Sequence, residues 1–313
     1  MRERKLFEVV SVNISEKKGT IKVPVDEISL GLKGVEHDAH AGDWNRQVSL
    51  LGEESINKFR KMIDRDIRPG EFAENITTRG KILYEMSPLD RFKIGEAELE
   101  ITQIGKECHG KSCAIFQEVG NCVMPKEGIF TRVISEGRIR AGMMIEYLPH
   151  KYQVWVVTLS DRASRGDYAD RSGPAIIERM ERFFQHDKKP CHILHRIIPD
   201  NAGDLADILT EARGGRVDIL ITTGGTGIGP RDITPDVILP RLDKVLPGIM
   251  ELIRIKYGAD KPGALLSRGV AGIMGGTLVY TLPGSVKAVS EYMEEIQKSL
   301  QHALWMLHGL DIH

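Results

Sequence analysis

The strongest constraint on the fold is a regular alternation of apolar runs and helical patterns in the second half of the chain. The run "YQVWVVTL" (152–159) is almost continuously apolar, which is typical of a strand buried on both faces of a sheet. A helical pattern follows at 172–185, with Ser172 as its expected N-cap and Pro174 in its first turn. The pattern then continues as strand, helix and strand at 191–199, 202–213 and 217–223. This alternation predicts a doubly wound α/β domain.

The end of the chain follows the same pattern. A strand is expected at 277–283, and a long helix is expected after Gly284. Apolar residues recur there at three- and four-residue steps, as on one face of a helix: Val286, Val289, Met293, Ile296, Leu300 and Leu304.

The first half has a different pattern. Short β-branched runs, separated by Gly, Pro and Asn, predict strands at 7–15, 19–25, 47–51, 91–105 and 142–148. A helix is expected at 52–63. Because strands and helices do not alternate regularly here, we expect a mixed β barrel or closed sheet. The chain as a whole is predicted to be α/β, with a β-rich domain at 1–148 and a doubly wound domain at 149–313.

Length and composition fit two globular domains. The chain has 313 residues, of which 41% are hydrophobic and 28% charged. A formal net charge of −1 carries no signature of a nucleic-acid binder. The sequence shows neither a secretory leader at its N-terminus nor an apolar run of membrane-spanning length. We therefore expect a cytoplasmic protein whose partners include neither nucleic acid nor a membrane.

Four loops are expected at the carboxyl ends of the strands in the second half, where α/β sheets bind ligands: 160–173, 199–204, 222–236 and 282–289. The third reads "TTGGTGIGPRDITPD". It is neither a Walker loop nor a dinucleotide fingerprint, because Pro230 stands where either pattern would require a different residue. Its glycines, its threonine hydroxyls and the helix expected from Thr234 favour an anion site. The alternative is a glycine turn that only reverses the chain.

Two aspartates stand out beside this proposed anion site. Asp200 and Asp232 would repel phosphate unless they hold Mg²⁺ or accept hydrogen bonds from a ligand's N–H groups. Asp200 could instead cap the helix that follows it. Asp232 could instead shape its own loop or form a salt bridge with Arg231. The residues alone leave these alternatives open.

The motifs "VVTLSDRASRGDYADRSGP", "IIPDN", "TTGGTGIGPRDITPD" and "YTLPGSVKAV" together resemble the MoaB/Mog family of molybdenum-cofactor biosynthesis over about residues 150–310. The resemblance implies a doubly wound fold that forms trimers or dimers of trimers. It also implies an enzyme, a molybdopterin adenylyltransferase. In its reaction molybdopterin and ATP, with Mg²⁺, give adenylyl-molybdopterin and pyrophosphate. Other proteins of the molybdenum-cofactor pathway are implied as further partners.

The resemblance also implies the residues of the site. The family's functional aspartates correspond to Asp200 and Asp232, as catalytic residues and metal ligands. The remaining binding residues implied in this domain are Ser160, Asp161, Thr223, Gly224, Gly225, Thr226, Gly227, Gly284 and Ser285. The molybdopterin phosphate is already an anion, so positioning and charge neutralisation would suffice for transfer. A pterin-binding carrier with the same pocket but no adenylylation is the alternative function.

A cysteine-rich segment of the first half, 105–130, contains Cys108, His109, Cys113 and Cys122. Zinc binding is one interpretation, although the segment has no C-x-x-C pair. Buried free cysteines are the second. The third is a reactive thiolate activated by Lys106, His109 and Lys111.

The first half, over about residues 5–148, is similar to a MOSC domain. The similarity rests on the stretches "GVEHDAHAGDWNRQVSLL", "GEFAENITTRG", "GKECH" and "GIFTRVISEGRIRAGMMIEYL". His37-Asp38 replaces the Gly-Asp of many relatives. The similarity implies a β-rich domain that binds a molybdopterin-type cofactor or carries sulfur on a cysteine, for which Cys108 is the best match. Arg46 and Arg79 are candidate phosphate contacts.

Overall fold

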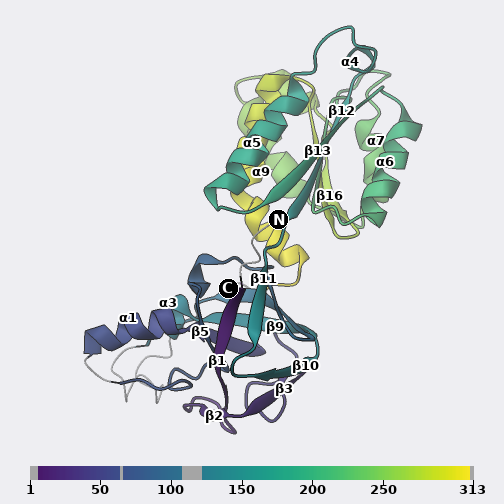
Figure 1. Cartoon of the computed structure of the whole chain (residues 1–313). Coiled ribbons are helices and arrows are strands. Elements are labelled where there is room, and N and C mark those ends of the chain that lie inside the picture. Colours follow the sequence, from purple (N-terminus) through teal and green to yellow (C-terminus); the bar gives the residue numbers. More distant parts are fainter. Residues whose placement is uncertain (1–5, 64–65, 108–121, 311–313) are drawn as a thin grey trace. The chain divides into compact units, whose positions relative to one another are not determined.

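The computed structural model describes residues 6–63, 66–107 and 122–310, and the chain divides into two compact units (Figure 1). Among the described residues, the first unit runs to His150 and also includes Leu310, and the second covers Lys151–Gly309. The domain division expected from the sequence, between residues 148 and 149, stays a prediction. No helix in the described ranges is both long and apolar enough to cross a membrane.

The first unit is a closed β barrel, as predicted. Its described strands form an eight-stranded sheet in the order β11-β7-β8-β9-β5-β6-β1-β2, and pairing of β1 with β11 closes it. A small sheet, β10-β3-β4, accompanies it. The strand bounds are β1 (Leu6–Ile14), β2 (Val23–Val25), β3 (Glu27–Gly31), β4 (Gly34–Val35), β5 (Val48–Gly52), β6 (Ile76–Arg79), β7 (Arg91–Ile94), β8 (Ala97–Ile104), β9 (Ile129–Ser135), β10 (Gly137–Arg140) and β11 (Met144–Leu148).

Inward-pointing side chains fill the barrel. Val9, Leu50, Phe92, Leu99 and Ile145 are completely buried in one cluster. They come from five different strands, so each strand contributes its alternate residues to the same core. The short helix α3 (Met124–Glu127) precedes β9.

One crossover in the barrel was not expected from the sequence. Helix α1 (Glu53–Ile63) connects β5 to β6, and these two strands pair in parallel. The helix itself lies where it was predicted. Its apolar side packs beside the barrel, where Ile56 and Phe59 join a cluster with Phe72 and Phe130. A parallel pair needs such a crossover, because a tight turn can join only antiparallel strands.

The second unit is a doubly wound α/β domain, as predicted. Its six-stranded sheet has the order β13-β12-β14-β17-β16-β15. The first four strands are parallel, and β16 and β15 each run antiparallel to the preceding neighbour. The strand bounds are β12 (Tyr152–Leu159), β13 (Cys191–Ile198), β14 (Ile219–Thr223), β15 (Lys244–Val245), β16 (Ala271–Met274) and β17 (Thr277–Leu282).

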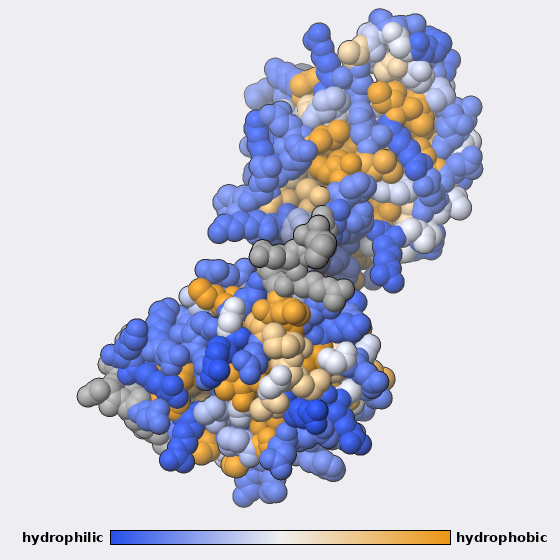
Figure 2. All heavy atoms as spheres, viewed as in Figure 1, coloured by the Kyte–Doolittle hydropathy of each residue, from blue (hydrophilic) through white to orange (hydrophobic). Residues whose placement is uncertain are grey.

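Helices cover both faces of this sheet. Figure 1 shows α5 and α9 on one face and α6 and α7 on the other. Figure 2 shows mostly hydrophilic side chains on the viewed surface of each unit, with apolar patches among them. The helix bounds are α4 (Asp161–Ser164), α5 (Ser172–His186), α6 (Ala202–Gly214), α7 (Thr234–Ile238), α8 (Pro247–Gly258) and α9 (Val286–Leu307).

One local prediction about these helices was wrong. Ser172 is the first residue of α5 and not its N-cap, which is Arg171. The carboxylate of Asp170 accepts the N–H groups of Ser172 and Gly173 and so does the work expected of a serine cap. The helix predicted after Gly284 is α9, and its predicted apolar residues are buried from Val289 onward, whereas Val286 in the first turn is 44% exposed.

The order of the strands determines where a ligand site can lie. The chain passes from β12 to β13 at one side and then returns to form β14 on the other side of β12. Loops that leave β12 and β14 therefore diverge, and a crevice opens between them at the carboxyl edge. The strands end there at Leu159, Thr223 and Leu282.

A buried ion pair in the first unit supplies a test of stability. The side chains of Lys22 and Asp38 are both completely buried and paired, and Asp38 also accepts the N–H groups of Ser15 and His40. Lys22→Met should lower the free energy of unfolding by about 3–5 kcal/mol, because it leaves a buried carboxylate without its cation. Lys33→Met, at the exposed pair with Asp43, is the control and should change little. Urea unfolding measures both, and equal effects would contradict the prediction.

Candidate functional site

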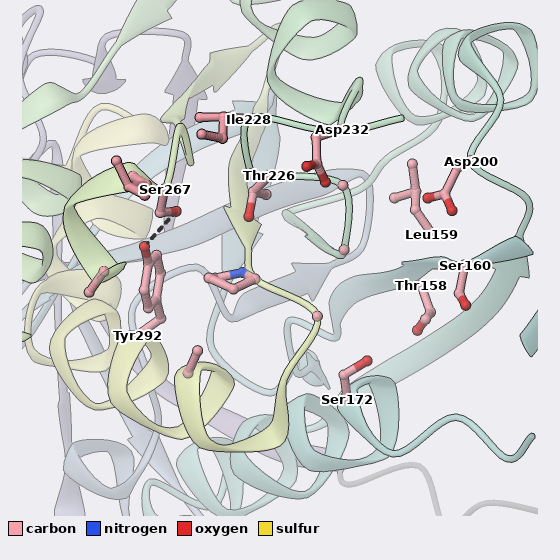
Figure 3. Close-up of a pocket in the computed structure, with 18 of the residues that line it drawn as sticks. Thr158, Leu159, Ser160, Ser172, Asp200, Thr226, Ile228, Asp232, Ser267 and Tyr292 are labelled. Carbon is pink, nitrogen blue, oxygen red and sulfur yellow. Dashed lines mark hydrogen bonds between the residues drawn. The ribbon is translucent and has the colours of Figure 1, made fainter. Parts of the chain in front are cut away.

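A cavity of about 640 Å³ opens at the carboxyl edge of the second unit's sheet. Its walls come from the loops after β12, β13, β14 and β17, together with α8, α9 and the segment between them. In Figure 3 Asp200 and Asp232 lie on one side of this cavity, and Tyr292 lies on the other, hydrogen-bonded to Ser267. The strand order therefore brings together four loops that are far apart in sequence.

Glycines shape the loop after β14. Gly224 and Gly225 have φ angles of +103° and +63°, which residues with a Cβ rarely adopt. A Cβ on Gly224 would lie 2.3 Å from the carbonyl oxygen of Leu159, and one on Gly225 would lie 2.5 Å from Oγ1 of Thr234. The Thr234 hydroxyl donates to the carbonyl of Gly224 at 2.8 Å. The loop is thus packed directly against the end of β12 and the start of α7.

Asp232 faces this loop and also holds it. Its Oδ2 accepts the N–H of Gly229 at 2.8 Å, and its carboxylate points toward the cavity beside Thr226 (Figure 3). Among the described residues, no hydrogen bond is formed by its Oδ1. The expected loop-shaping role is therefore present, and one oxygen stays available to a ligand. The alternative salt bridge to Arg231 is wrong, because Arg231 pairs with Asp161.

Asp200 is clamped to Asp161. The N–H of Asp161 donates to Oδ2 of Asp200 at 3.2 Å, and the N–H of Asp200 donates to Oδ1 of Asp161 at 3.1 Å. The alternative cap role for Asp200 is wrong, because the N-cap of α6 is Asn201, whose Oδ1 accepts two N–H groups of the first turn. Partial burial, together with the nearby carboxylates of Asp161 and Asp232, raises the pKa of Asp200. A carboxylate in that setting gains from a neighbouring cation.

Most of the predicted binding residues lie at the cavity. Its lining includes Ser160, Asp200, Gly224, Gly225, Thr226, Gly227, Asp232 and Gly284. Asp161, Thr223 and Ser285 are not part of the lining. The buried Thr223 hydroxyl donates to the carbonyl of Pro283 at 2.8 Å, and Ser285 caps α9 by accepting the N–H of Ala288. These two hydroxyls have structural partners, so the ligand roles predicted for them stay predictions.

Several lining residues were missed by sequence reasoning. Tyr257, Leu266, Ser267 and Tyr292 form the far wall of the cavity, and Tyr292 donates its hydroxyl to Ser267 at 2.9 Å. Tyr292 is 4% exposed and belongs to the buried face of α9. A tyrosine on a mostly apolar face was the available signal, because a buried hydroxyl needs a polar partner.

A polar network supports the floor of the cavity. Thr158 and Ser172 both line it, and both donate their hydroxyls to Asp170, at 2.6 and 2.9 Å. His195 lies 3.2 Å from the same carboxylate. Burial opposes ionisation of Asp170, but these hydroxyl and backbone hydrogen bonds outweigh it and lower its pKa. The network fixes the ends of β12 and α5 relative to each other.

The cysteine segment of the first unit is only partly described. Cys108, His109, Lys111 and Cys113 lie outside the described residues, so the three interpretations of the segment stay as they were. Cys122 is half-buried against the cluster beneath α1. Arg79 donates two hydrogen bonds to Glu53. Its guanidinium therefore has a structural partner, and the phosphate contact expected of it stays a prediction. Arg46 lies over the ring of Trp44, 5.1 Å from its centroid.

Comparison with known proteins identifies one domain family in each unit of the chain. Residues 155–302 match the family described as "Probable molybdopterin binding domain", and residues 37–146 match the MOSC domain. A molybdopterin adenylyltransferase of Pyrococcus furiosus is 37% identical over 161 residues, which are 50% of this chain and 91% of that protein. One from Helicobacter pylori is 34% identical over 158 residues, 50% of this chain and 88% of that protein. Gephyrin of Dictyostelium discoideum is 36% identical over 168 residues, 51% of this chain and 23% of its own length.

The second unit is thus an α/β domain with a glycine-lined cavity at its topological switch point. The chain belongs to the molybdopterin-binding domain family and joins that domain to a MOSC domain. It spans about a quarter of gephyrin but nearly the full length of the adenylyltransferases that it matches.

The glycine turn supplies a second test of stability. Gly224→Ala should lower the free energy of unfolding of the second unit by at least about 2 kcal/mol, because it adds positive-φ strain to a clash with the Leu159 carbonyl. Gly214→Ala is the control, since a Cβ at this helical position meets nothing within 4 Å. Urea unfolding should show it neutral or slightly stabilising. A Gly224→Ala variant as stable as the control would contradict the account of the turn.

The raised pKa of Asp200 predicts a pH-dependent stability. The folded state binds the proton of Asp200 more tightly than the unfolded state, so this residue lowers stability as pH rises above its usual value of 3.8. Asp200→Asn should therefore raise the melting temperature at pH 7 and lose that advantage toward pH 4. Asp207→Asn, at an exposed position of α6, is the control. An advantage of equal size at both pH values would contradict the assignment.

Proposed function

We propose that the second unit transfers an adenylyl group from ATP to the terminal phosphate of molybdopterin and releases pyrophosphate. The observation that carries this proposal is the convergence of Asp200, Asp232 and the glycine loop on one cavity at the carboxyl edge of the sheet. The names of the relatives that match nearly their full length support the same reaction. Their similarity covers the second unit alone.

The chemistry requires little from the protein beyond position and charge. An oxygen of the molybdopterin phosphate attacks the α-phosphorus of ATP, and the bond from that phosphorus to the β-phosphate oxygen breaks. The attacking oxygen is already an anion, so no strong base is needed. N–H groups of the glycine loop, which glycine lets approach a ligand closely, would stabilise charge on the transferred phosphoryl group. The network of Thr158 and Asp170 would keep the floor of the site rigid, which favours correct alignment.

The site fits Mg²⁺ held jointly by protein and substrate. Asp161, Asp200 and Asp232 do not bring three ligand atoms within 4.8 Å of one another, so they do not form a closed protein cage. Mg²⁺ is usually held by one or two carboxylates together with substrate phosphates. We infer that Asp200 and Asp232 would hold the ion, which when bound would neutralise phosphate charge. This also explains why carboxylates stand beside an anion site.

We further infer that the first unit handles the same class of ligand. Its match to the MOSC domain supports this inference, and the closed barrel supplies a rigid frame for it. Whether it binds the cofactor or carries sulfur depends on the segment around Cys108. The trimeric or hexameric assembly and the cytoplasmic location stay predictions.

Asp232 provides the direct test of the proposed reaction. Asp232→Asn should lower adenylyl transfer by roughly 100-fold or more, because it removes one of the two carboxylates inferred to hold Mg²⁺ and so weakens the electrostatic stabilisation of the transferred phosphoryl group. The fold should persist, since the asparagine oxygen can still accept the Gly229 N–H. The measurement is pyrophosphate release from Mg-ATP in the presence of molybdopterin, with circular dichroism as the folding check.

The control is Asp167→Asn, which removes an exposed carboxylate that pairs with Arg165 outside the cavity lining. It should release pyrophosphate at the wild-type rate. Unchanged turnover in Asp232→Asn would refute the catalytic assignment. Molybdopterin binding by the wild-type protein without any pyrophosphate release would instead establish the carrier function.

A further inference from the structure

The cavity holds little positive charge for a site of this kind. Among the described residues that line it, Arg231 is the one cation, whereas Asp200, Asp232 and Glu291 all carry carboxylates. Glu291 is paired with Lys261, which lies outside the lining. A triphosphate entering this cavity would meet strong repulsion unless cations face it. Arg231 is therefore the protein's own candidate for that task.

Arg231 is held loosely. Its side chain is 68% exposed, and its described partner is the carboxylate of Asp161, which is 21% exposed. Asp161 uses its other oxygen to accept the N–H of Asp200 at 3.1 Å. Because the guanidinium of this pair is largely exposed to solvent, the pair contributes little to stability, and the guanidinium can leave the half-buried Asp161 at small cost.

Arg268, which contacts the same loop, is held much more firmly than Arg231. Its Nε donates to the carbonyl of Gly227 at 2.7 Å, and its two terminal nitrogens bond Asp236 at 2.8 and 3.0 Å. It also donates to the carbonyl of Asp232. These bonds hold Arg268 to the loop, whereas Arg231, which lines the cavity, has a single described ion partner.

We propose that Arg231 is a phosphate-contact residue that exchanges Asp161 for the ligand's β- and γ-phosphates and stays with them as pyrophosphate leaves. This rests on the proposed function for the identity of the ligand, but the phosphate contact itself can be tested alone. A guanidinium can donate two parallel hydrogen bonds to phosphate oxygens. Asp161 is then the internal competitor that holds Arg231 when the ligand is absent.

A purely structural pair would behave differently. If the bond between Arg231 and Asp161 served only to hold the two loops together, removing either partner would affect ligand binding in the same direction. If Arg231 exchanges partners, removing Arg231 weakens phosphate binding, but removing the charge of Asp161 strengthens it. Opposite signs for the two variants therefore distinguish exchange from bracing.

The experiment measures binding of inorganic pyrophosphate to the full chain by calorimetry, in EDTA so that no divalent metal contributes. Arg231→Ala should weaken affinity roughly 10- to 100-fold, the range expected for hydrogen bonds to a charged group. The affinity of Arg231→Lys should lie between those of the wild type and Arg231→Ala, because an ammonium group keeps the charge but lacks the paired donors of a guanidinium. Asp161→Asn should tighten affinity roughly two- to fivefold, since the ion pair between Asp161 and Arg231 no longer competes with the ligand.

Arg165→Ala is the matched control. Arg165 is also an exposed arginine of these loops, paired with Asp167, but it does not line the cavity. Its affinity for pyrophosphate should equal that of the wild type. Circular dichroism and thermal unfolding of every variant confirm that each one folds.

Three results would overturn the inference: no measurable binding of pyrophosphate to the wild type, unchanged affinity in Arg231→Ala, or weaker binding in Asp161→Asn. Failure of the proposed function appears separately. If the predicted affinities hold but the wild type releases no pyrophosphate from Mg-ATP with molybdopterin, Arg231 contacts phosphate in a site that does not adenylylate.

Discussion

The architecture of the site depends on one tight approach between two chain segments, where Gly224 packs on the carbonyl of Leu159 at the ends of β14 and β12. These strands are neighbours in the sheet, with Thr158 opposite Thr223. The approach is close enough to exclude any side chain, and it requires a backbone conformation suited to glycine. Because of it, the loops after both strands lie within reach of one ligand. A larger residue would push the glycine loop away from Ser160 and Asp200.

Around this contact, some polar side chains are used to hold the loops in place, and others are left to contact a ligand. Thr234, Arg268 and Asp170 use their polar atoms to fasten loops and helix ends. Asp232 does both, because one carboxylate oxygen accepts the N–H of Gly229 in the loop and the other is left for a ligand. Arg231 is the residue most available to a ligand, because its side chain is exposed and has a single described ion partner. This division is what a phosphoryl-transfer site needs, because the frame must stay fixed while charges are offered to a changing ligand.

More of the fold than of the candidate site could be predicted from the sequence. Continuous apolar runs identified the strands of the second unit because strands buried on both faces need no polar side, and they occur as β12, β14 and β17 with nearly all residues buried. Asp232 and the glycines followed from their place after β14, and Asp200 followed from its place after β13. The pairing of Tyr292 with Ser267 could not be predicted, because the two residues are distant in sequence and meet on one wall of the cavity only in the folded domain. The cap of α5 was assigned to the wrong residue because Asp170 reaches past Arg171.

The sequence by itself determined the two kinds of domain and the loops that carry the chemistry of the second unit. It also determined the strands β12, β13, β14 and β17 and the helices α5, α6, α7 and α9, whereas β15, α8 and β16 were not predicted. These are local properties, since periodicity and backbone freedom depend on neighbouring residues. Tertiary structure alone decided the partners: that Arg231 pairs with Asp161 and not with its neighbour Asp232, that Asp200 is clamped and not a cap, and that Thr223 is turned away from the cavity. The physical reason is that charge pairing and burial depend on distances in space, and strand order brings residues 160, 200 and 231 to one edge of the sheet.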